Sequence, residues 1–343
     1  MRDLAVGLLL LCSCDRLFGL EPVDVGQVRK LMFDNTESGT DLIDVPVLVV
    51  LDQTVVDRDA LAKAITTLAF HDPDTNRDLP FEIDHVDPDG QIAVWVLVPQ
   101  IDRGSATDSI TMTIGGSDSA VRATDVWSGQ FELVTHLEPD HVVDSTGAGH
   151  TGVLSGPTFA SGQIGSGIEL AGAPAQQVTF STSDALFDRW DRFTLELWVH
   201  PSYAAPTDLV GEGRILGKGG ALGPSRVFLD GASQLQLQFD FAFEAGLTYL
   251  GTQVPTQAWS YIAYSYDGQR LSLYKDGTSA GTQELAAAGP LKSSSGPLYL
   301  GADSTPLKGS LDEVRVSRLD RSPDWIRAQY RAMARQFVTF TAP

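Results

Sequence analysis

The pattern of apolar and polar side chains in residues 259–277 shows two extended runs that flank a short polar turn. Aromatic and aliphatic side chains occupy both faces of the first run, because successive side chains of a strand point in opposite directions. Asp267-Gly268 ends this run, and Asp276-Gly277 ends the next. Both pairs suit tight turns, since glycine adopts a positive φ without a Cβ clash and aspartate tolerates it. The pattern predicts a β-hairpin.

Strand-like runs also fill residues 27–126, where turn sequences separate them. The expected strands lie at residues 30–35, 45–52, 79–84, 92–98 and 109–114. A short helix is expected at residues 60–67. These runs predict a first, β-rich domain.

Residues 127–343 continue the strand pattern up to a helix signal near the C-terminus. Ser322 supplies an N-cap, Pro323 a first-turn proline and Asp324 a first-turn acid. A short strand is expected at residues 337–340, and we assign helix and strand to the second domain. A chain of 343 residues is long enough for about two domains. The pattern predicts an all-β protein of two β-sandwich domains with a short helix near the C-terminus.

The hairpin at residues 259–277 resembles the W-x-x-x-A-x-x-Y-D-G-x-x-L-x-L-Y-x-D-G hairpin of laminin-G-like domains, which are concanavalin A-like jelly rolls. Other motifs similar to that family occur in the family's order, at residues 143–152, 162–170, 193–201, 297–301 and 308–316. The resemblance implies that residues 127–343 form a jelly-roll domain. Residues 27–126 resemble a bacterial domain of unknown function that commonly precedes such a module in secreted proteins. This second resemblance implies no activity.

The first 14 residues resemble a bacterial lipoprotein signal peptide. Their apolar run, residues 4–11, is too short to span a bilayer, which takes about 20 apolar residues. Leu11, Ser13 and Cys14 match a lipobox, so Cys14 is expected to carry the lipid. Cys12 fits less well because Leu11 before it is not small. An ordinary signal peptide cut nearby is the alternative.

Residues 15–26 would then form a tether of at most about 40 Å. We therefore expect an exported protein of the cell envelope, held to a membrane by a lipid anchor. Asp15 resembles an inner-membrane retention signal, but sorting rules differ between bacterial groups, so the choice between inner and outer membrane stays open. No cysteine follows Cys14, so no disulfide is expected in the mature chain.

Acidic residues outnumber basic ones by 44 to 24, which gives a formal net charge of −20. Nucleic-acid phosphates require a Lys/Arg surface, so this balance argues against a nucleic-acid partner. The sequence has no nucleophile elbow, no H-E-x-x-H motif and no glycine-rich phosphate loop. The histidines are scattered, and His136 and His141 lack the spacing of metal ligands.

Glu82, Asp84 and Asp87 resemble the E-x-D-x-x-E catalytic strand of laminarinase-type glycosidases, whose acids act as nucleophile and acid/base. The last position is one methylene shorter here, and the trio lies outside the expected jelly roll. We therefore prefer the alternative, an edge strand whose acids face outward before a turn.

Laminin-G-like and concanavalin-type domains often bind Ca²⁺ through loop carboxylates, and the resemblance implies Asp144 and Asp312 as metal ligands. The alternatives are that Asp144 caps its own glycine-rich turn and that Asp312 faces solvent. Trp190 lies between charged residues, so we expect an exposed indole that stacks on a sugar ring. Packing at the edge of the sandwich is the alternative for this residue.

These observations favour a non-catalytic recognition or adhesion lipoprotein of the cell envelope that binds an extracellular carbohydrate or protein through its jelly roll. A glycoside hydrolase on the same fold is one alternative, and it would need an acidic pair on the concave face of the second domain. Glu169, Glu196 and Glu244 are the candidates for that pair. The other alternative is an architectural envelope protein without a ligand.

Overall fold

The computed structural model describes residues 27–56, 58–115, 123–127, 129–139, 142–219, 225–231, 233–243, 246–285, 289–302 and 304–341. The expected signal peptide, its lipidated Cys14 and the tether lie outside the described residues, as do His141 and Glu244. Within the described ranges, no helix is long and apolar enough to cross a membrane.

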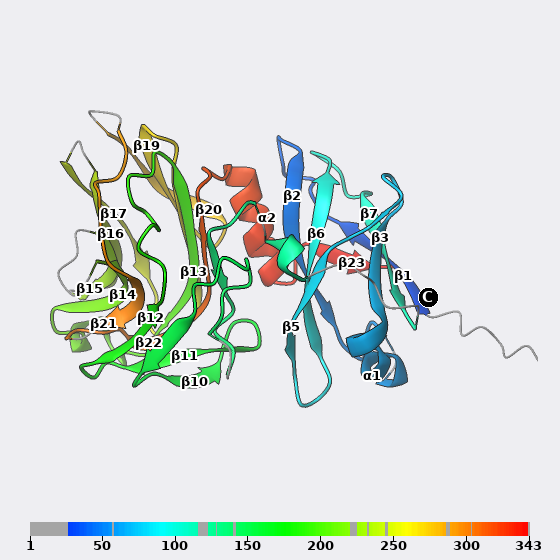
Figure 1. Ribbon diagram of the computed structural model, residues 1–343, viewed down its shortest axis with the longest axis horizontal. Helices are drawn as coiled ribbons and strands as arrows, with labels where there is room; N and C mark the ends of the chain where they lie inside the picture. The colour runs from blue at the N-terminus through cyan, green and yellow to red at the C-terminus, as the bar shows by residue number, and fades with distance from the viewer. Residues whose placement is uncertain are drawn as a thin grey trace, which may run out of the picture.

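The first domain is a β-sandwich of two antiparallel sheets (Figure 1). In the described residues one sheet has five strands in the order β23-β1-β7-β3-β4, and the other has three in the order β2-β6-β5. A helix, α1, covers one end of the sandwich (Figure 1). The elements are β1 (Gln27–Phe33), β2 (Leu42–Leu51), α1 (Arg58–Thr67), β3 (Leu68–Asp72), β4 (Arg77–Asp78), β5 (Phe81–Val86), β6 (Ile92–Ile101), β7 (Ser109–Ile114) and the C-terminal β23 (Val338–Phe340).

The second domain is a larger sandwich. Its described residues form a seven-stranded sheet and an eight-stranded sheet, which enclose an aliphatic and aromatic core. The seven-stranded sheet runs β17 (Gly246–Val254), β16 (Leu235–Phe243), β15 (Ser225–Gly231), β14 (Glu212–Lys218), β21 (Leu298–Ala302), β12 (Gln176–Phe180) and β9 (Gly152–Ser155). The eight-stranded sheet runs β10 (Thr158–Ser161), β11 (Ser166–Ala171), β22 (Lys308–Ser317), β13 (Phe193–Pro201), β18 (Ser260–Tyr266), β19 (Arg270–Lys275) and β20 (Thr278–Glu284), with β8 (Leu133–Thr135) also paired to β22. Among the described residues, two short 3₁₀ helices, η2 (Ala123–Val126) and η3 (Pro206–Asp208), lie in the connections.

The expected fold class, all-β with two β-sandwich domains and a short C-terminal helix, is confirmed. The predicted hairpin forms β18 and β19, and Gly268 in its turn has φ 100°. Successive side chains of β18 point to opposite faces of the sheet as expected, but both faces are buried. Tyr264 lies in the jelly-roll core, whereas Tyr261 packs in the core shared with the first domain.

Helix α2 (Pro323–Met333) lies between the two sandwiches (Figure 1). The predicted cap is present, since the Ser322 hydroxyl accepts a hydrogen bond from the Trp325 amide at 3.2 Å. The apolar side of the helix, including Trp325 and Ile326, joins the core of the first domain.

The last strand corrects the expected domain assignment. β23 does not join the jelly roll, because it pairs antiparallel with β1 and so completes the five-stranded sheet of the first domain. The physical reason is that β1 offers unpaired backbone groups along its free edge. Phe337, just before β23, also stacks on Phe33 with ring centroids 6.0 Å apart. The first and the last described strands therefore lie in one sheet.

The first domain and α2 cover the outer face of the eight-stranded sheet. Trp198 and Tyr261 on this face belong to the same buried cluster as Trp95, Trp127 and Trp325. Figure 1 shows the three-stranded sheet and α2 on this side of the jelly roll, with the seven-stranded sheet on the far side. The outer face of the seven-stranded sheet is therefore the broad face of the jelly roll directed away from the first domain.

Candidate functional site

A continuous row of side chains crosses the outer face of the seven-stranded sheet. Residues that pair directly across antiparallel strands point to the same side of a sheet. The register places one such row across the whole sheet, through Tyr249, Asp240, Arg226, Gly217, Tyr299, Thr179 and Val153. The two ends of the row are open to solvent, with Tyr249 56 % and Val153 62 % exposed. We call this row the outer-face row.

Gly217 allows an aromatic ring to lie close to the sheet in the middle of this row. A Cβ at Gly217 would lie 2.3 Å from the Tyr299 hydroxyl and 2.4 Å from its ring. Any other residue would displace the ring, because real Cβ atoms do not approach that closely. The absence of a side chain at Gly217 therefore allows the Tyr299 ring to lie against the neighbouring strand.

Arg226 binds two carboxylates on the same face. Its Nε donates to Asp240 Oδ2 at 3.1 Å, and its Nη1 donates to Glu212 Oε2 at 2.7 Å. The guanidinium carbon also lies 4.6 Å from the centre of the Phe228 ring. Aromatic rings beside fixed polar groups can contact both the apolar face and the hydroxyls of a sugar.

The structure corrects the expectation of an exposed indole at Trp190. Trp190 is 3 % exposed and packs in the jelly-roll core, with its ring centroid 5.2 Å from that of Phe187. Its charged neighbours Asp191 and Arg192 are exposed, so the polarity of the surrounding sequence belongs to side chains that point the other way. A buried indole cannot stack on a sugar, and the alternative of packing describes this residue.

Asp144 holds its own turn, as the alternative to calcium binding predicts. Its Oδ1 accepts hydrogen bonds from the amide and the hydroxyl of Thr146, at 3.0 and 2.7 Å, and from the Val134 amide at 3.2 Å. These contacts fasten the loop to β8.

Asp312 is fully buried, so the alternative that it faces solvent is wrong. Its Oδ2 accepts hydrogen bonds from the amides of Gln163 and Ile164, at 2.8 and 2.9 Å, and Oδ1 accepts one from the Glu313 amide. Burial raises the pKa of this carboxyl well above its usual range. Gly162 is required here, because a Cβ would lie 2.6 Å from Asp312 Oδ2. Asp144 and Asp312 thus serve different loops, and calcium binding by them stays a prediction.

The hydrolase-like acids are not on an open surface. Glu82 and Asp84 lie on β5, an edge strand as expected, but their side chains are only 16 % and 1 % exposed because the jelly roll covers them. The expectation that they face outward is therefore wrong. Asp87 is directed elsewhere, since it accepts hydrogen bonds from His85 on β5 and from Gln91 after the turn.

The other acids considered for hydrolysis do not form a pair. Glu169 is exposed on β11, and Glu196 on β13 is buried, where it accepts a hydrogen bond from the Tyr261 hydroxyl. Glu244 lies outside the described residues.

A buried group of charged residues joins the two domains, and we call Glu82, Asp84, His136, Glu313 and Arg315 the interdomain cluster. His136 Nδ1 lies 2.7 Å from Glu313 Oε1 and 3.5 Å from Asp84 Oδ2, and its Nε2 lies 3.4 Å from Glu82 Oε2. Arg315 forms an ion pair with Glu313.

Two tryptophan rings pack against this cluster on the side of the first domain. The Arg315 guanidinium lies 4.1 Å from the centre of the Trp95 ring and 5.1 Å from that of Trp127. The indole nitrogens of Trp95 and Trp127 donate to Asp84 and Glu82.

Burial and mutual proximity shift the pKa values of this cluster. Burial raises the pKa of Asp84 well above its usual range, even beside His136. Burial alone would lower the pKa of His136, but the carboxylates of Asp84 and Glu313 outweigh it and raise that pKa well above 6.5. Burial likewise opposes ionisation of Glu313, yet His136 and Arg315 lower its pKa.

Sequence reasoning missed this cluster because its members come from three distant segments. The spacing of Glu82 and Asp84 was the one local signal, since it places both side chains on one face of a strand. Neither His136 nor Glu313 lies near them in the sequence.

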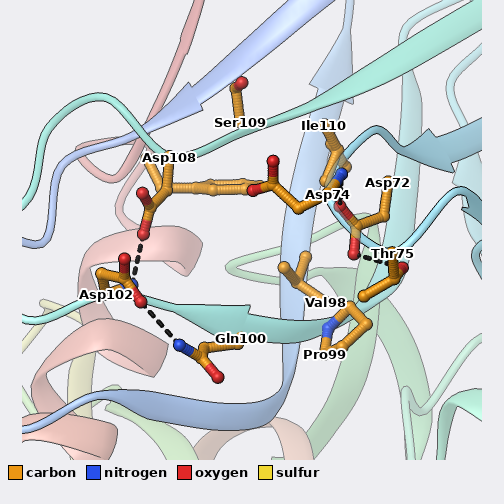
Figure 2. A pocket seen from close by; sticks show the side chains of 11 residues that line it. Asp72, Asp74, Thr75, Val98, Pro99, Gln100, Asp102, Asp108, Ser109 and Ile110 are labelled. Atoms are coloured by element: carbon orange, nitrogen blue, oxygen red, sulfur yellow. Dashed lines mark hydrogen bonds between the residues drawn. The ribbon is translucent and has the colours of Figure 1, made fainter.

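The first domain has a second polar feature, an acidic cavity of about 200 Å³ at one end of its sandwich (Figure 2). Four aspartates line it, and their carboxylates mainly fasten local turns. Asp72 accepts hydrogen bonds from the Asp74 amide at 2.9 Å and the Thr75 hydroxyl at 2.7 Å. Asp108 accepts one from the Asp102 amide, and Asp102 one from the Gln100 side chain.

Residues 172–327 match the family model described as the concanavalin A-like lectin/glucanases superfamily, in its laminin G form. This part of the chain is therefore a laminin-G-like, concanavalin A-like domain, as the motifs at residues 193–201 and 259–277 predict. No curated protein matches the sequence.

Solved structures with a similar arrangement have low sequence identity. Domain 4 of AbnA, a GH43 extracellular arabinanase from Geobacillus stearothermophilus solved with arabinotriose, is 18 % identical with a TM-score of 0.47, over 59 % of this chain and 98 % of that one. The binding domain of Paraclostridial Mosquitocidal Protein 1 is 12 % identical with a TM-score of 0.48, over 61 % and 53 %. The botulinum neurotoxin serotype G binding domain is 15 % identical with a TM-score of 0.48, over 58 % and 50 %. The chain thus spans about half the length of the two toxin structures. At these sequence identities and TM-scores, the structural similarity gives no information about ligands.

Proposed function

We propose that the protein is a non-catalytic recognition protein of the cell envelope, which binds an extracellular carbohydrate through the outer face of its seven-stranded sheet. The strongest support is the arrangement of the two jelly-roll faces. The first domain and α2 cover the eight-stranded sheet, so the broad surface left for a ligand is the outer face of the seven-stranded sheet.

The side chains of that row suit a sugar better than a flat protein surface. Tyr249 offers an exposed ring, whereas Tyr299, further along the row, is buried over Gly217 and supports the sheet without contacting a ligand. The partly exposed guanidinium of Arg226, held by Asp240 and Glu212, supplies hydrogen-bond donors in a fixed geometry. Sugar-binding sites commonly combine aromatic faces with a few oriented polar groups.

The carboxylates of this face favour binding over hydrolysis. A glycosidase needs a pair of carboxyl groups of which one can donate a proton to the leaving oxygen. Asp240 and Glu212 instead both accept hydrogen bonds from the single guanidinium of Arg226. Glu82 and Asp84, the pair that resembles a hydrolase motif, are covered by the second domain.

We also propose that the protein is exported and anchored through lipid at Cys14. The support is the lipobox-like sequence at residues 11–14 and the absence of any later cysteine. The tether of residues 15–26 would hold both domains near the membrane, with the outer face of the jelly roll directed away from the first domain.

A glycan array probed with the purified protein tests the proposed activity, with a reducing-end assay on every glycan that the protein retains. We expect retention of at least one glycan class without release of new reducing ends. Release of reducing ends would establish the hydrolase alternative. Retention of no glycan, with the protein folded, would contradict carbohydrate binding and favour a protein ligand or an architectural role.

A further inference from the structure

Three side chains from distant parts of the chain converge in the interdomain cluster. Asp84 comes from β5 of the first domain, while His136, just after β8, and Glu313 on β22 come from the jelly roll. One potential ligand atom from each lies within 4.8 Å of the other two. In the described part of the chain, this is the group of histidine and carboxylate side chains with the spacing of a metal site.

Neighbouring polar groups orient the three side chains. His136 Nε2 faces Glu82 Oε2 at 3.4 Å, Asp84 Oδ2 accepts from the Trp95 indole at 3.0 Å, and Glu313 Oε2 accepts from Arg315. A histidine that binds a metal almost always donates its other ring N–H to a carboxylate or carbonyl, which leaves the first nitrogen free for the ion. The Glu82 contact orients His136 in this way, with Nδ1 toward Asp84 and Glu313.

A second observation is an unsatisfied oxygen on Asp84, in the same carboxylate whose Oδ2 faces His136 Nδ1 at 3.5 Å. The Asp84 side chain is 1 % exposed, and its Oδ1 is buried without a hydrogen-bond partner among the described residues. A buried acceptor of this kind is costly unless something satisfies it.

The net charge of the cluster also favours a divalent ion. The carboxylates of Glu82, Asp84 and Glu313 face one permanent cation, the guanidinium of Arg315. A metal ion would displace the proton that His136 holds in the metal-free cluster; with a neutral imidazole and three ionised carboxylates two negative charges then remain, and one divalent ion balances them.

The backbone at Glu313 is shaped to deliver its side chain to this place. Glu313 has φ 50°, which is uncommon for a residue other than glycine. It lies at a bulge, where the register between β22 and β13 shifts beside Glu196 and Trp198. Bulges re-aim side chains, and residues in sparsely populated conformations gather at functional sites.

We propose that Asp84, His136 and Glu313 bind a divalent transition-metal ion, of which zinc is the expected one, and that this ion links the first domain to the jelly roll. Imidazole and carboxylate ligands together suit zinc and its neighbours in the first transition row better than calcium, which takes oxygen ligands alone. The site is separate from the outer-face row, so the result of a test for metal binding does not depend on whether the proposed function is correct.

Elemental analysis of the full-length protein tests this inference. The protein is stripped with a chelator, dialysed against zinc and then freed of excess metal. We expect about one zinc per chain, and a melting temperature that falls on chelation and recovers with zinc. X-ray absorption at the zinc edge should show nitrogen and oxygen ligands with one imidazole.

Variants separate the site from adventitious binding. Asp84→Asn keeps an acceptor for Trp95 but removes a ligand, so it should lose both the stoichiometric zinc and the zinc-dependent rise in melting temperature. Glu82→Gln replaces the carboxylate that orients His136 and that also accepts from Trp127 and Ser145, and it should bind zinc about 10–100-fold more weakly. Glu169→Gln, an exposed carboxylate on β11, should bind as wild type.

A folded wild-type protein that retains no zinc after this treatment would overturn the site, and would leave the cluster as a network of ion pairs around a protonated His136. Zinc retained equally by Asp84→Asn would also overturn it. If Asp84→Asn does not fold, the affinity of Glu82→Gln and the absorption spectrum of the wild type decide.

Discussion

Glu196 lies on the outer face of the eight-stranded sheet, where the first domain and α2 exclude water. Its carboxylate is 1 % exposed, accepts a hydrogen bond from the Tyr261 hydroxyl, and lies in the field of Arg315 and Arg321. Burial nevertheless raises the pKa of Glu196, since neither these arginines nor Tyr261 fully compensate for the loss of water. Glu196 therefore makes stability depend on pH.

The substitution Glu196→Gln tests this residue. A raised pKa in the folded state means that the folded protein binds the proton more tightly, so stability is greatest below the ordinary pKa of 4.5 and falls as pH rises through the folded-state pKa. The glutamine variant would lack this loss, because its side chain does not ionise. Urea unfolding between about pH 4 and pH 7 measures the free energy of unfolding of both proteins. With rising pH, the value for the variant should increase relative to that of the wild type, by about 1.4 kcal/mol per unit of pKa difference. A stability difference that is the same at every pH would contradict the burial account.

At the scale of elements, α2 acts as a connector whose side chains reach both domains. The Gln329 amide donates to the Pro46 carbonyl on β2 at 2.7 Å, and its oxygen accepts from Arg315 on β22 at 2.8 Å. Both partners are buried, so one side chain satisfies a polar group from each sandwich. Its removal would leave the Pro46 carbonyl and an Arg315 N–H without partners in the interior.

Gln329→Ala should therefore lower the free energy of unfolding by about 2–6 kcal/mol, because each of the two unsatisfied buried groups costs about 1–3 kcal/mol. Arg327→Ala is the matched control on the same helix. Its ion pair with Asp324 is partly exposed, and such pairs contribute about 0–1 kcal/mol. Chemical denaturation of the two variants measures both values. Equal effects would show that Gln329 does not connect the domains.

The last strand makes a related prediction for the first domain. Removing residues 337–343 takes away β23 and the Phe337 ring, which packs on Phe33. The loss should destabilise the first domain by about 3–5 kcal/mol, the usual cost of deleting a buried aromatic side chain. Hydrogen exchange should then rise in β1 and β7, far from the truncation in sequence. Faster exchange confined to the jelly roll would contradict the observed pairing.

At the scale of the whole molecule, the two sandwiches form one body. β23 returns the chain to the sheet that β1 began, and α2 and the interdomain cluster fill the space between the domains. This arrangement closes one face of the jelly roll and directs the other away. A membrane anchor at the N-terminus would therefore present the outer-face row outward from the first domain.

Cys14→Ala tests the anchor. The variant should appear in the soluble fraction of cells, because a membrane-bound lipoprotein without its acylated cysteine loses its lipid chains. Cell fractionation with immunodetection measures the shift, and Cys12→Ala is the control that should stay with membranes. A Cys14→Ala protein that still pellets with membranes would contradict lipidation at this residue.

Sequence patterns predicted the parts of the fold that depend on neighbouring residues. The hairpin of β18 and β19, most strands of the first domain and the cap at Ser322 follow from alternation, turns and capping, which act within a few residues. The pairing of β23 with β1 depends on which sheet edge is free, and Trp190 is buried although its neighbours are charged. The convergence of Asp84, His136 and Glu313 needs two domains in contact, which no local pattern encodes.

The outer-face row is tested most directly by the affinity of two variants for the glycan that the array selects. Tyr249 is 56 % exposed on β17, and Val28, at 55 %, is equally exposed on β1 of the first domain. Calorimetric titration should show Tyr249→Ala binding at least about tenfold more weakly, which corresponds to about 1.4 kcal/mol, with Val28→Ala unchanged. An unchanged affinity in Tyr249→Ala, with the loss appearing in Val28→Ala or in neither variant, would contradict a binding site on the outer face of the seven-stranded sheet.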